Sequence, residues 1–222
     1  MIRLLGVFTI LLSAAGGSAC VAESGPALPY YADRLFTPSW TPVSHSVTTH
    51  AAGDTPFLDQ AGTPFTPSSL RGTVHVVSFI FTRCAAICPP LVSSLKKVQA
   101  ATAGSRVTLV SYSVDPVNDS VPVLQDFAIS RGIESTRWKL LTGSINGVHQ
   151  VARDLYFADD DGMRKSLADP DTFLHTEKVL LIDRDGHIRG LYNGTQPFEI
   201  QKLIEDAGVL VAESVRAVAS RN

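Results

Sequence analysis

Two cysteines, Cys84 and Cys88, are separated by three apolar residues in the stretch FTRCAAICPP, and the whole chain of 222 residues has only three cysteines. Paired thiols can form a structural disulfide, act as a redox couple or bind a metal ion. A disulfide across so short a loop removes little entropy from the unfolded chain, so stabilisation is a weak reason for the pair. The spacing leaves the redox and metal interpretations open, because it permits a disulfide and also lets both sulfur atoms face one ion.

The segments on either side of the pair indicate how the thiols are positioned. Residues 73–82, TVHVVSFIFT, form a β-branched and aromatic run that predicts a buried strand ending just before Cys84. Pro89 and Pro90 suit the first turn of a helix, where a missing N–H group costs nothing, so a helix is expected to begin at Cys88. Ligands of open α/β sheets bind beyond the carboxyl ends of strands, and a helix N-terminus favours thiolate over thiol. We therefore expect a reactive or metal-binding site at this turn, with a lowered cysteine pKa.

A metal site needs more than two thiolates, and the chain has six histidines from which a third ligand could come. His175 is the strongest candidate, because it lies in FLHTEKVLLID, just before a strand that is expected to be adjacent to the central one. The other five are interpreted as structural or solvated: two on a linker at the surface, one partly covered in a strand, one on a helix face and one in a hairpin turn. In that order they are His45 and His50, His75, His149, and His187.

The rest of the chain predicts alternating strands and helices, ending in a hairpin and a helix. A turn at Gln-Ala-Gly indicates an early hairpin in residues 57–72, and the Asp-Gly of residues 178–194 is a strong hairpin signal. The expected elements between and after them are helix 89–103, strand 106–115, helix 120–132 ended by a glycine, strand 138–143, helix 145–157 and helix 197–211. This order predicts an α/β fold with helices on both faces of the sheet.

The N-terminal residues 1–22 have one charge before an apolar stretch that ends in small residues, as an export signal does. Three outcomes are open: lipid attachment at Cys20, because GSAC resembles a lipoprotein box; cleavage after Ala22; or an uncleaved membrane anchor. All three place the mature domain outside the cytoplasm. Residues 23–52 are rich in Pro, Ser and Thr and are expected to be a flexible linker, followed by a domain at 53–208 and a C-terminal tail at 209–222. A net charge of −2 gives no indication of nucleic-acid binding.

Three motifs together resemble the Sco/SenC family of thioredoxin-like copper proteins: FIFTRCAAICPP, SVDPVNDSVPVLQDFA and FLHTEKVLLIDRDGHIRGLYNG. The resemblance covers residues 53–208 and implies a thioredoxin-like fold with a central mixed sheet, flanking helices and an N-terminal hairpin. It also implies that Cys84, Cys88 and His175 bind one copper ion per chain, as Cu(I) or Cu(II). The family usually has proline after the first cysteine, where this chain has Ala85, a change that bears on the rigidity and redox behaviour of the loop.

The resemblance implies a copper metallochaperone that delivers copper to the binuclear site of cytochrome c oxidase subunit II, from the periplasmic side of the bacterial inner membrane. The alternatives are a thiol–disulfide oxidoreductase, with Cys84 and Cys88 as its redox pair and a thiol reductase as partner, or a copper or redox sensor. Exported reductases of this fold usually have a proline where this chain has His175. A ligand in place of a substrate-docking proline favours metal binding.

The motif at the end of the second long strand contains acidic residues with two interpretations. The family links an aspartate at the position of Asp115 to copper uptake or partner interaction, which would put it close to the copper ligands. The alternative is a local turn made by Asp115 before Pro116. Asn118 and Asp119 are expected to begin the next helix, with Asp119 or Ser120 as its cap.

Overall fold

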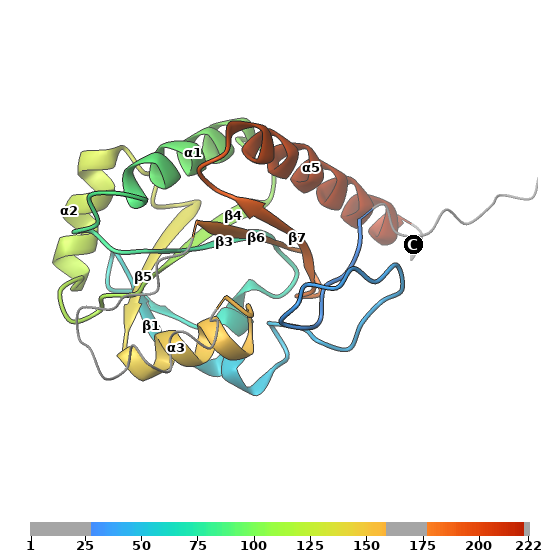
Figure 1. Ribbon diagram of the computed structural model, residues 1–222, viewed down its shortest axis with the longest axis horizontal. Coiled ribbons are helices and arrows are strands. Elements are labelled where there is room, and N and C mark those ends of the chain that lie inside the picture. Colours follow the sequence, from blue (N-terminus) through green and yellow to red (C-terminus); the bar gives the residue numbers. More distant parts are fainter. Residues whose placement is uncertain (1–27, 159–176, 220–222) are drawn as a thin grey trace, which may run out of the picture.

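The structure is a computed structural model that describes residues 28–158 and 177–219, and its centre is one seven-stranded sheet in the order β2-β1-β5-β4-β3-β6-β7 (Figure 1). Strand β3 is paired in parallel with β4, and β4 with β5, whereas the other pairings are antiparallel. The sheet is therefore mixed. Its strands are β1 Phe57–Asp59, β2 Pro64–Phe65, β3 Val74–Ile80, β4 Val107–Ser113, β5 Trp138–Gly143, β6 Lys178–Ile182 and β7 Ile188–Asn193.

Helices cover both faces of this sheet. Figure 1 shows α1 and α5 together on one side and α3 on the opposite side, and α2 contacts β5. Every residue of β3 is buried, as expected for a central strand between two helical layers. The helices are α1 Cys88–Ala101, α2 Val121–Arg131, α3 Ile145–Asp154 and α5 Pro197–Ala219, and two short 3-10 helices are η1 Ala51–Asp54 and η2 Pro67–Leu70.

The predicted α/β fold, with a central mixed sheet, flanking helices and an N-terminal hairpin, is confirmed. Gly132 ends α2 in the left-handed conformation, as the sequence predicts. Element ends differ by a few residues, and α3 ends at Asp154 rather than at 157. The last helix, α5, continues to Ala219, so residues 209–219 of the expected tail belong to it. The physical reason is that VLVAESVRAVA extends the helical pattern without a Gly or Pro to end it.

The described part of the expected linker, residues 28–52, packs against the β6–β7 hairpin instead of extending away from the domain. Val47 is fully buried and its N–H donates to the carbonyl of Gly186 at 2.8 Å. Gly186 has φ +85°, and a Cβ there would lie 2.5 Å from the hydroxyl of Ser46, so the close approach requires glycine. Tyr31 forms a β-bridge with Ile188 of β7. The Pro-, Ser- and Thr-rich composition concealed this contact, because it depends on a few isolated apolar residues rather than on a periodic pattern.

Within residues 28–158 and 177–219, no helix has the length and the apolar character needed to cross a membrane.

Candidate metal centre

The two cysteines lie at the carboxyl end of β3, where parallel strands β3 and β4 both end. Cys84 follows β3 by four residues and Cys88 is the first residue of α1, as the sequence predicts. Both are free thiols and nearly buried, with exposed fractions of 9% and 6%. The pair is therefore enclosed at the edge of the sheet where ligand sites of this fold class occur.

The Cys84 sulfur lies at the N-terminus of α1. The backbone N–H of Cys88 donates to Cys84 Sγ at 3.3 Å. Burial by itself would raise the pKa of Cys84, but hydrogen bonds from the Cys88 thiol and from the N–H groups of Cys88, Ala86 and Ile87 lower it below its usual value. This is the predicted effect of a helix N-terminus on a thiol, and it makes Cys84 the better nucleophile and metal ligand of the two.

Cys88 differs from Cys84 in its electrostatic surroundings. Burial is the largest cause that raises the pKa of the Cys88 thiol to about 12. The Cys84 sulfur and the charge of Asp119 act in the same direction, against a backbone hydrogen bond from Phe81. At neutral pH the pair consequently has one proton that is hard to remove without a bound cation.

His175, the predicted third ligand, lies outside the described residues. What the structure gives is the strand that follows it in the sequence. Strand β6 begins at Lys178 and runs antiparallel to β3, with Val77 opposite Leu180. The beginning of β6 is therefore at the same end of the sheet as the cysteines, which agrees with the prediction about the strand and leaves His175 itself a prediction.

Asp115 lies beside the cysteine loop, and its carboxylate is fully engaged. Its Oδ2 accepts hydrogen bonds from Arg83 Nη2 at 2.6 Å and Nε at 3.1 Å, and its Oδ1 accepts from Asn118 Nδ2 at 2.8 Å. The carbonyl of Asp115 also accepts from the N–H groups of Asn118 and Asp119. Asp115 thus makes the local turn that the sequence allows and also holds the residue before Cys84.

Asp119 was expected to begin or cap the next helix, and its role at this site is different. The N-cap of α2 is Ser120, without a side-chain capping bond. Asp119 instead is completely buried, and its carboxylate accepts hydrogen bonds from Thr82 and Ser113, at the ends of β3 and β4. The signal that could have revealed it is the occurrence of polar residues just where two buried parallel strands end.

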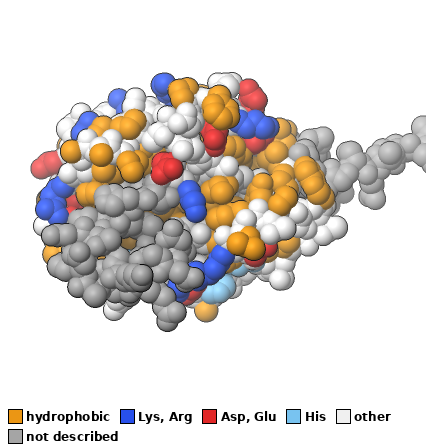
Figure 2. Space-filling model, viewed as in Figure 1, with side chains coloured by type: hydrophobic (Ala, Val, Ile, Leu, Met, Phe, Trp, Pro, Cys, Tyr) orange, Lys and Arg blue, Asp and Glu red, His pale blue; other side chains and the backbone are white. Residues whose placement is uncertain are grey.

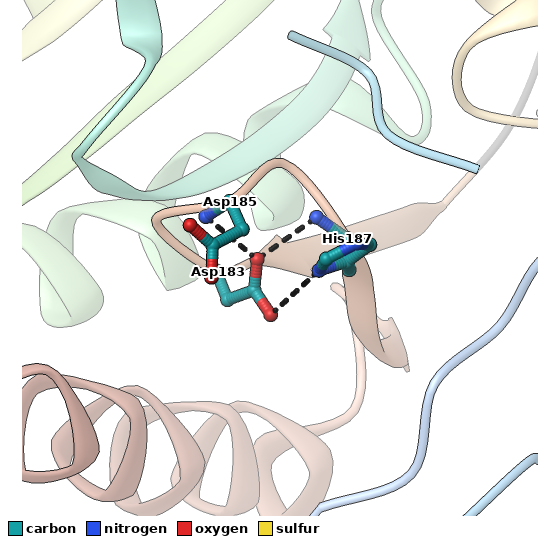
Figure 3. Close-up of side chains that lie close together, drawn as sticks. All are labelled: Asp183, Asp185 and His187. Carbon is teal, nitrogen blue, oxygen red and sulfur yellow. Dashed lines mark hydrogen bonds and ion pairs between the residues drawn. The ribbon is translucent and has the colours of Figure 1, made fainter. Parts of the chain in front are cut away.

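A second group of metal-binding residue types lies in the β6–β7 turn (Figure 3). The carboxylate and imidazole groups of Asp183, Asp185 and His187 lie within 4.8 Å of one another. Asp183 Oδ1 accepts from the N–H groups of Asp185 and His187 at 3.0 and 2.9 Å, and Oδ2 lies 3.3 Å from His187 Nδ1. The buried guanidinium of Arg189 donates to the same Oδ2 at 3.0 Å.

These contacts determine the charges in the turn. Burial opposes ionisation of Asp183, but His187 and Arg189 lower the pKa of Asp183 below its usual range. Asp183 in turn raises the pKa of His187 above its usual value. His187, expected to be solvated, has a side chain only 17% exposed because it is held by this carboxylate. Both carboxylate oxygens of Asp183 are thus already engaged, by the guanidinium of Arg189, by His187 and by the backbone of the turn.

The other four described histidines differ in burial, and His45 is not at the surface as expected. His75 is fully buried rather than partly covered, and burial lowers its pKa to about 4. His45 is half-buried, with Nε2 2.9 Å from the carbonyl oxygen of Leu155. His50 is exposed, as expected, and its Nδ1 accepts from the N–H of Ala52. His149, expected to be solvated, is half-buried.

A cavity of about 690 Å³ lies away from the cysteines, between the N-terminal segment, β7 and α5. Figure 2 shows hydrophobic side chains gathered near α5 on the face in view. The cavity lining includes Tyr31, Trp40, Tyr192 and Phe198, with Lys202 and Asp206 paired at 2.6 Å. It has no residue of the candidate metal centre.

Comparison with known proteins agrees with the geometry. A protein-family model described as SCO1/SenC matches residues 44–210, which confirms the predicted resemblance and extends it into the packed N-terminal segment. The "SCO1 protein homolog" of Bacillus subtilis is 30% identical over 153 residues, which are 68% of this chain and 77% of that protein.

Solved structures share the fold. A SCO1/SenC family lipoprotein from Bacillus anthracis is 28% identical, with a TM-score of 0.59, over 70% of this chain and 91% of that one. BsSco, described as a member of the Sco family of cytochrome c oxidase assembly proteins with a disulfide switch, is 27% identical, with a TM-score of 0.61, over 77% and 95% of the two chains. Bradyrhizobium japonicum ScoI with copper bound is 22% identical, with a TM-score of 0.55, over 70% and 96%. The predicted thioredoxin-like fold is thereby confirmed.

Proposed function

Because this chain belongs to the SCO1/SenC family, we propose that it binds one copper ion through Cys84, Cys88 and His175 and delivers it to the binuclear copper site of cytochrome c oxidase subunit II. The observation that carries the proposal is the enclosed pair of free thiols at the end of β3, with β6 beginning at the same end of the sheet. His175 precedes the first residue of β6 by three positions in the sequence.

The donor chemistry suits copper. Thiolates are soft ligands that select Cu(I), and an imidazole completes a three-coordinate set, whereas zinc prefers a fourth ligand. The raised pKa of Cys88 means that copper binding must displace a firmly held proton. The low exposure of both sulfur atoms restricts access of water and oxidants to the site. Asp115, through Arg83, is proposed to steady this loop during copper uptake or contact with the client.

The direct test is the copper stoichiometry of the reduced protein, with X-ray absorption to count sulfur and nitrogen ligands. One copper with two sulfur ligands and at least one nitrogen ligand is expected. His175→Ala should lose that nitrogen ligand, and Cys84→Ser or Cys88→Ser should lose a sulfur. Full copper binding with an unchanged ligand count in all three variants would refute the proposal. Copper transfer to a purified subunit II domain tests the client.

A thiol–disulfide oxidoreductase is the second candidate function. It is favoured by the contrast between Cys84, with its lowered pKa, and Cys88, with its raised pKa, because redox pairs commonly have one activated and one protected thiol. Such an enzyme would reduce the copper-site cysteines of a partner and would need a thiol reductase to regenerate it. Complementation separates the two: full function in His175→Ala together with loss in Cys84→Ser would favour the reductase.

We further propose that the protein is exported and held at the periplasmic side of the inner membrane by a lipid on Cys20 or by an uncleaved N-terminal segment, or is released after cleavage behind Ala22. The Bacillus anthracis relative is described as a lipoprotein. The intact mass of the protein from the membrane fraction distinguishes the three forms, since only a lipidated chain begins at a modified Cys20.

A further inference from the structure

We propose that Asp119 is a positioning residue for the metal loop, residues 81–88: its buried carboxylate ties the end of β3 to the end of β4 and thereby fixes the place of Cys84. This inference rests on the proposed copper function and concerns a residue that contacts neither sulfur through any bond the structure gives. It explains why a carboxylate is buried here when the helix that follows does not use it as a cap.

The carboxylate accepts from three donors, two on Thr82, which follows β3 by two residues, and one on Ser113, the last residue of β4. Thr82 Oγ1 donates to Oδ1 at 2.5 Å, and the N–H of Thr82 donates to Oδ2 at 3.1 Å. Ser113 Oγ donates to Oδ2 at 2.6 Å. Thr82 is two residues before Cys84, so its backbone and side chain are both held where the chain leaves the sheet.

The neighbouring residue is held in a parallel way. Arg83 is bound by Asp115, and the N–H of Asp115 donates to Ser113 Oγ at 3.1 Å. The two residues before Cys84 are thus fixed by two carboxylates of one loop, residues 114–120. The hydrogen bonds of Asp119 are shielded from solvent more than the Arg83–Asp115 ion pair. Asp119 is fully buried, whereas the Arg83 side chain is 57% exposed.

A buried carboxylate is costly unless its hydrogen bonds are well formed, so a purely local turn would not need one. The two oxygen atoms of a carboxylate can accept from all three donors, whereas a hydroxyl oxygen has only two acceptor lone pairs. Loss of this carboxylate should therefore release both Thr82 and Ser113 beside the cysteine loop.

The experiment compares Asp119→Ala, Asp119→Asn and Thr82→Val in the full chain, with Asp126→Ala, an exposed carboxylate on α2, as the control. The first readout is the Cu(I) dissociation constant, measured by competition with a chromophoric chelator. The second uses no metal: the equilibrium of the protein dithiol with oxidised dithiothreitol, in which Cys84 and Cys88 lose two electrons to form a disulfide and dithiothreitol is reduced to its dithiol.

Asp119→Ala is expected to weaken Cu(I) binding about tenfold and to lower the disulfide equilibrium constant about tenfold, because an unpaired Thr82 N–H loosens the loop. Asp119→Asn retains the shape and one acceptor oxygen, so its Cu(I) affinity should fall less than that of Asp119→Ala. Thr82→Val should weaken binding about threefold. The double variant Asp119→Ala/Thr82→Val should be no weaker than Asp119→Ala, because Asp119→Ala already removes the bond from the Thr82 hydroxyl.

A folded Asp119→Ala protein with wild-type values in both readouts would overturn the proposal, and so would effects of Asp119→Ala and Thr82→Val that multiply in the double variant. If Asp119→Ala does not fold, Thr82→Val is compared with the control Asp126→Ala in both readouts. Equal values for these two variants would then overturn the proposal. If the wild type binds no Cu(I), the proposed function fails, but the disulfide equilibrium still tests the positioning role.

Discussion

Strand β3 has a group of potential metal ligands at each of its ends, and the two groups differ in how their donor atoms are used. At the carboxyl end, Cys84 and Cys88 are free thiols whose main contacts are backbone N–H groups and each other. At the other end, next to His75, the β6–β7 turn has Asp183, whose oxygens are engaged by the turn and by Arg189.

The contrast shows that residue types alone do not make a metal site. In the turn, a fixed guanidinium already neutralises the carboxylate, so a metal ion would have to displace it. At the cysteines, the neighbouring carboxylates of Asp115 and Asp119 are consumed by Arg83, Thr82 and Ser113, and the sulfur atoms remain available. Potential ligands are available to a metal ion only where the neighbouring charged and polar groups bind one another instead of the ligands.

The largest expected difference between the two ends is in copper binding. Cys88→Ser should abolish tight Cu(I) binding, because a hydroxyl is a poor ligand for a soft metal. Asp183→Asn should leave the copper stoichiometry unchanged, since its end of β3 takes no part. Titration of both reduced proteins with Cu(I) checks this, and reduced stoichiometry in a folded Asp183→Asn protein would contradict the comparison.

Replacing Arg189, the cation of the β6–β7 turn, should have the next largest effect, which is a loss in the free energy of unfolding. Arg189→Met leaves Asp183 buried without its cation and leaves the carbonyls of Leu28 and Pro29 without a donor. We expect a loss of about 3 kcal/mol in the free energy of unfolding, with copper binding retained. Arg153→Met, at the more exposed pair with Asp154, should lose less than about 1 kcal/mol. Urea unfolding measures both, and equal losses would show that burial of the pair is not what matters.

His75, at the end of β3 next to the β6–β7 turn, should make the free energy of unfolding depend on pH. Its pKa of about 4 in the folded protein lies below the unfolded value, so below about pH 6.5 the unfolded chain binds more protons and the fold loses stability. The contribution of His75 to the free energy of unfolding is complete above pH 6.5. It falls by up to about 3 kcal/mol as the pH drops toward 4. His75→Phe should remove this part of the pH dependence, as unfolding curves at pH 7 and pH 4.5 would show. A parallel loss in both proteins would contradict it.

The smallest effect concerns the two thiols themselves. Near neutral pH, Cys84 should react with iodoacetamide about tenfold faster than Cys88, because its pKa is lowered and that of Cys88 is raised. Mass spectrometry of peptides from the briefly treated, reduced protein measures the ratio. The single variants Cys84→Ser and Cys88→Ser serve as controls, and equal rates in them would show that the helix N-terminus does not separate the two.

Local patterns predicted most of the fold. The apolar run of β3, the prolines after Cys88, Gly132 at the end of α2 and the Asp-Gly turn before β7 each specify a backbone conformation through nearby residues. The packed segment 28–52 could not be predicted in the same way. Its contacts with the β6–β7 hairpin join residues more than 130 positions apart, such as Val47 and Gly186, and no periodic pattern marks them.

The sequence by itself determined the two thiols, their place between a buried strand and a helix N-terminus, and the resemblance that makes His175 their expected companion. It did so because these features depend on neighbouring residues and on short motifs. Only the tertiary structure decided that Cys84 and Cys88 differ in pKa, that Asp119 joins two strand ends rather than capping a helix, and that His187 is held by Asp183. Those properties arise from burial and from hydrogen bonds between separate elements, which exist only once the sheet has formed.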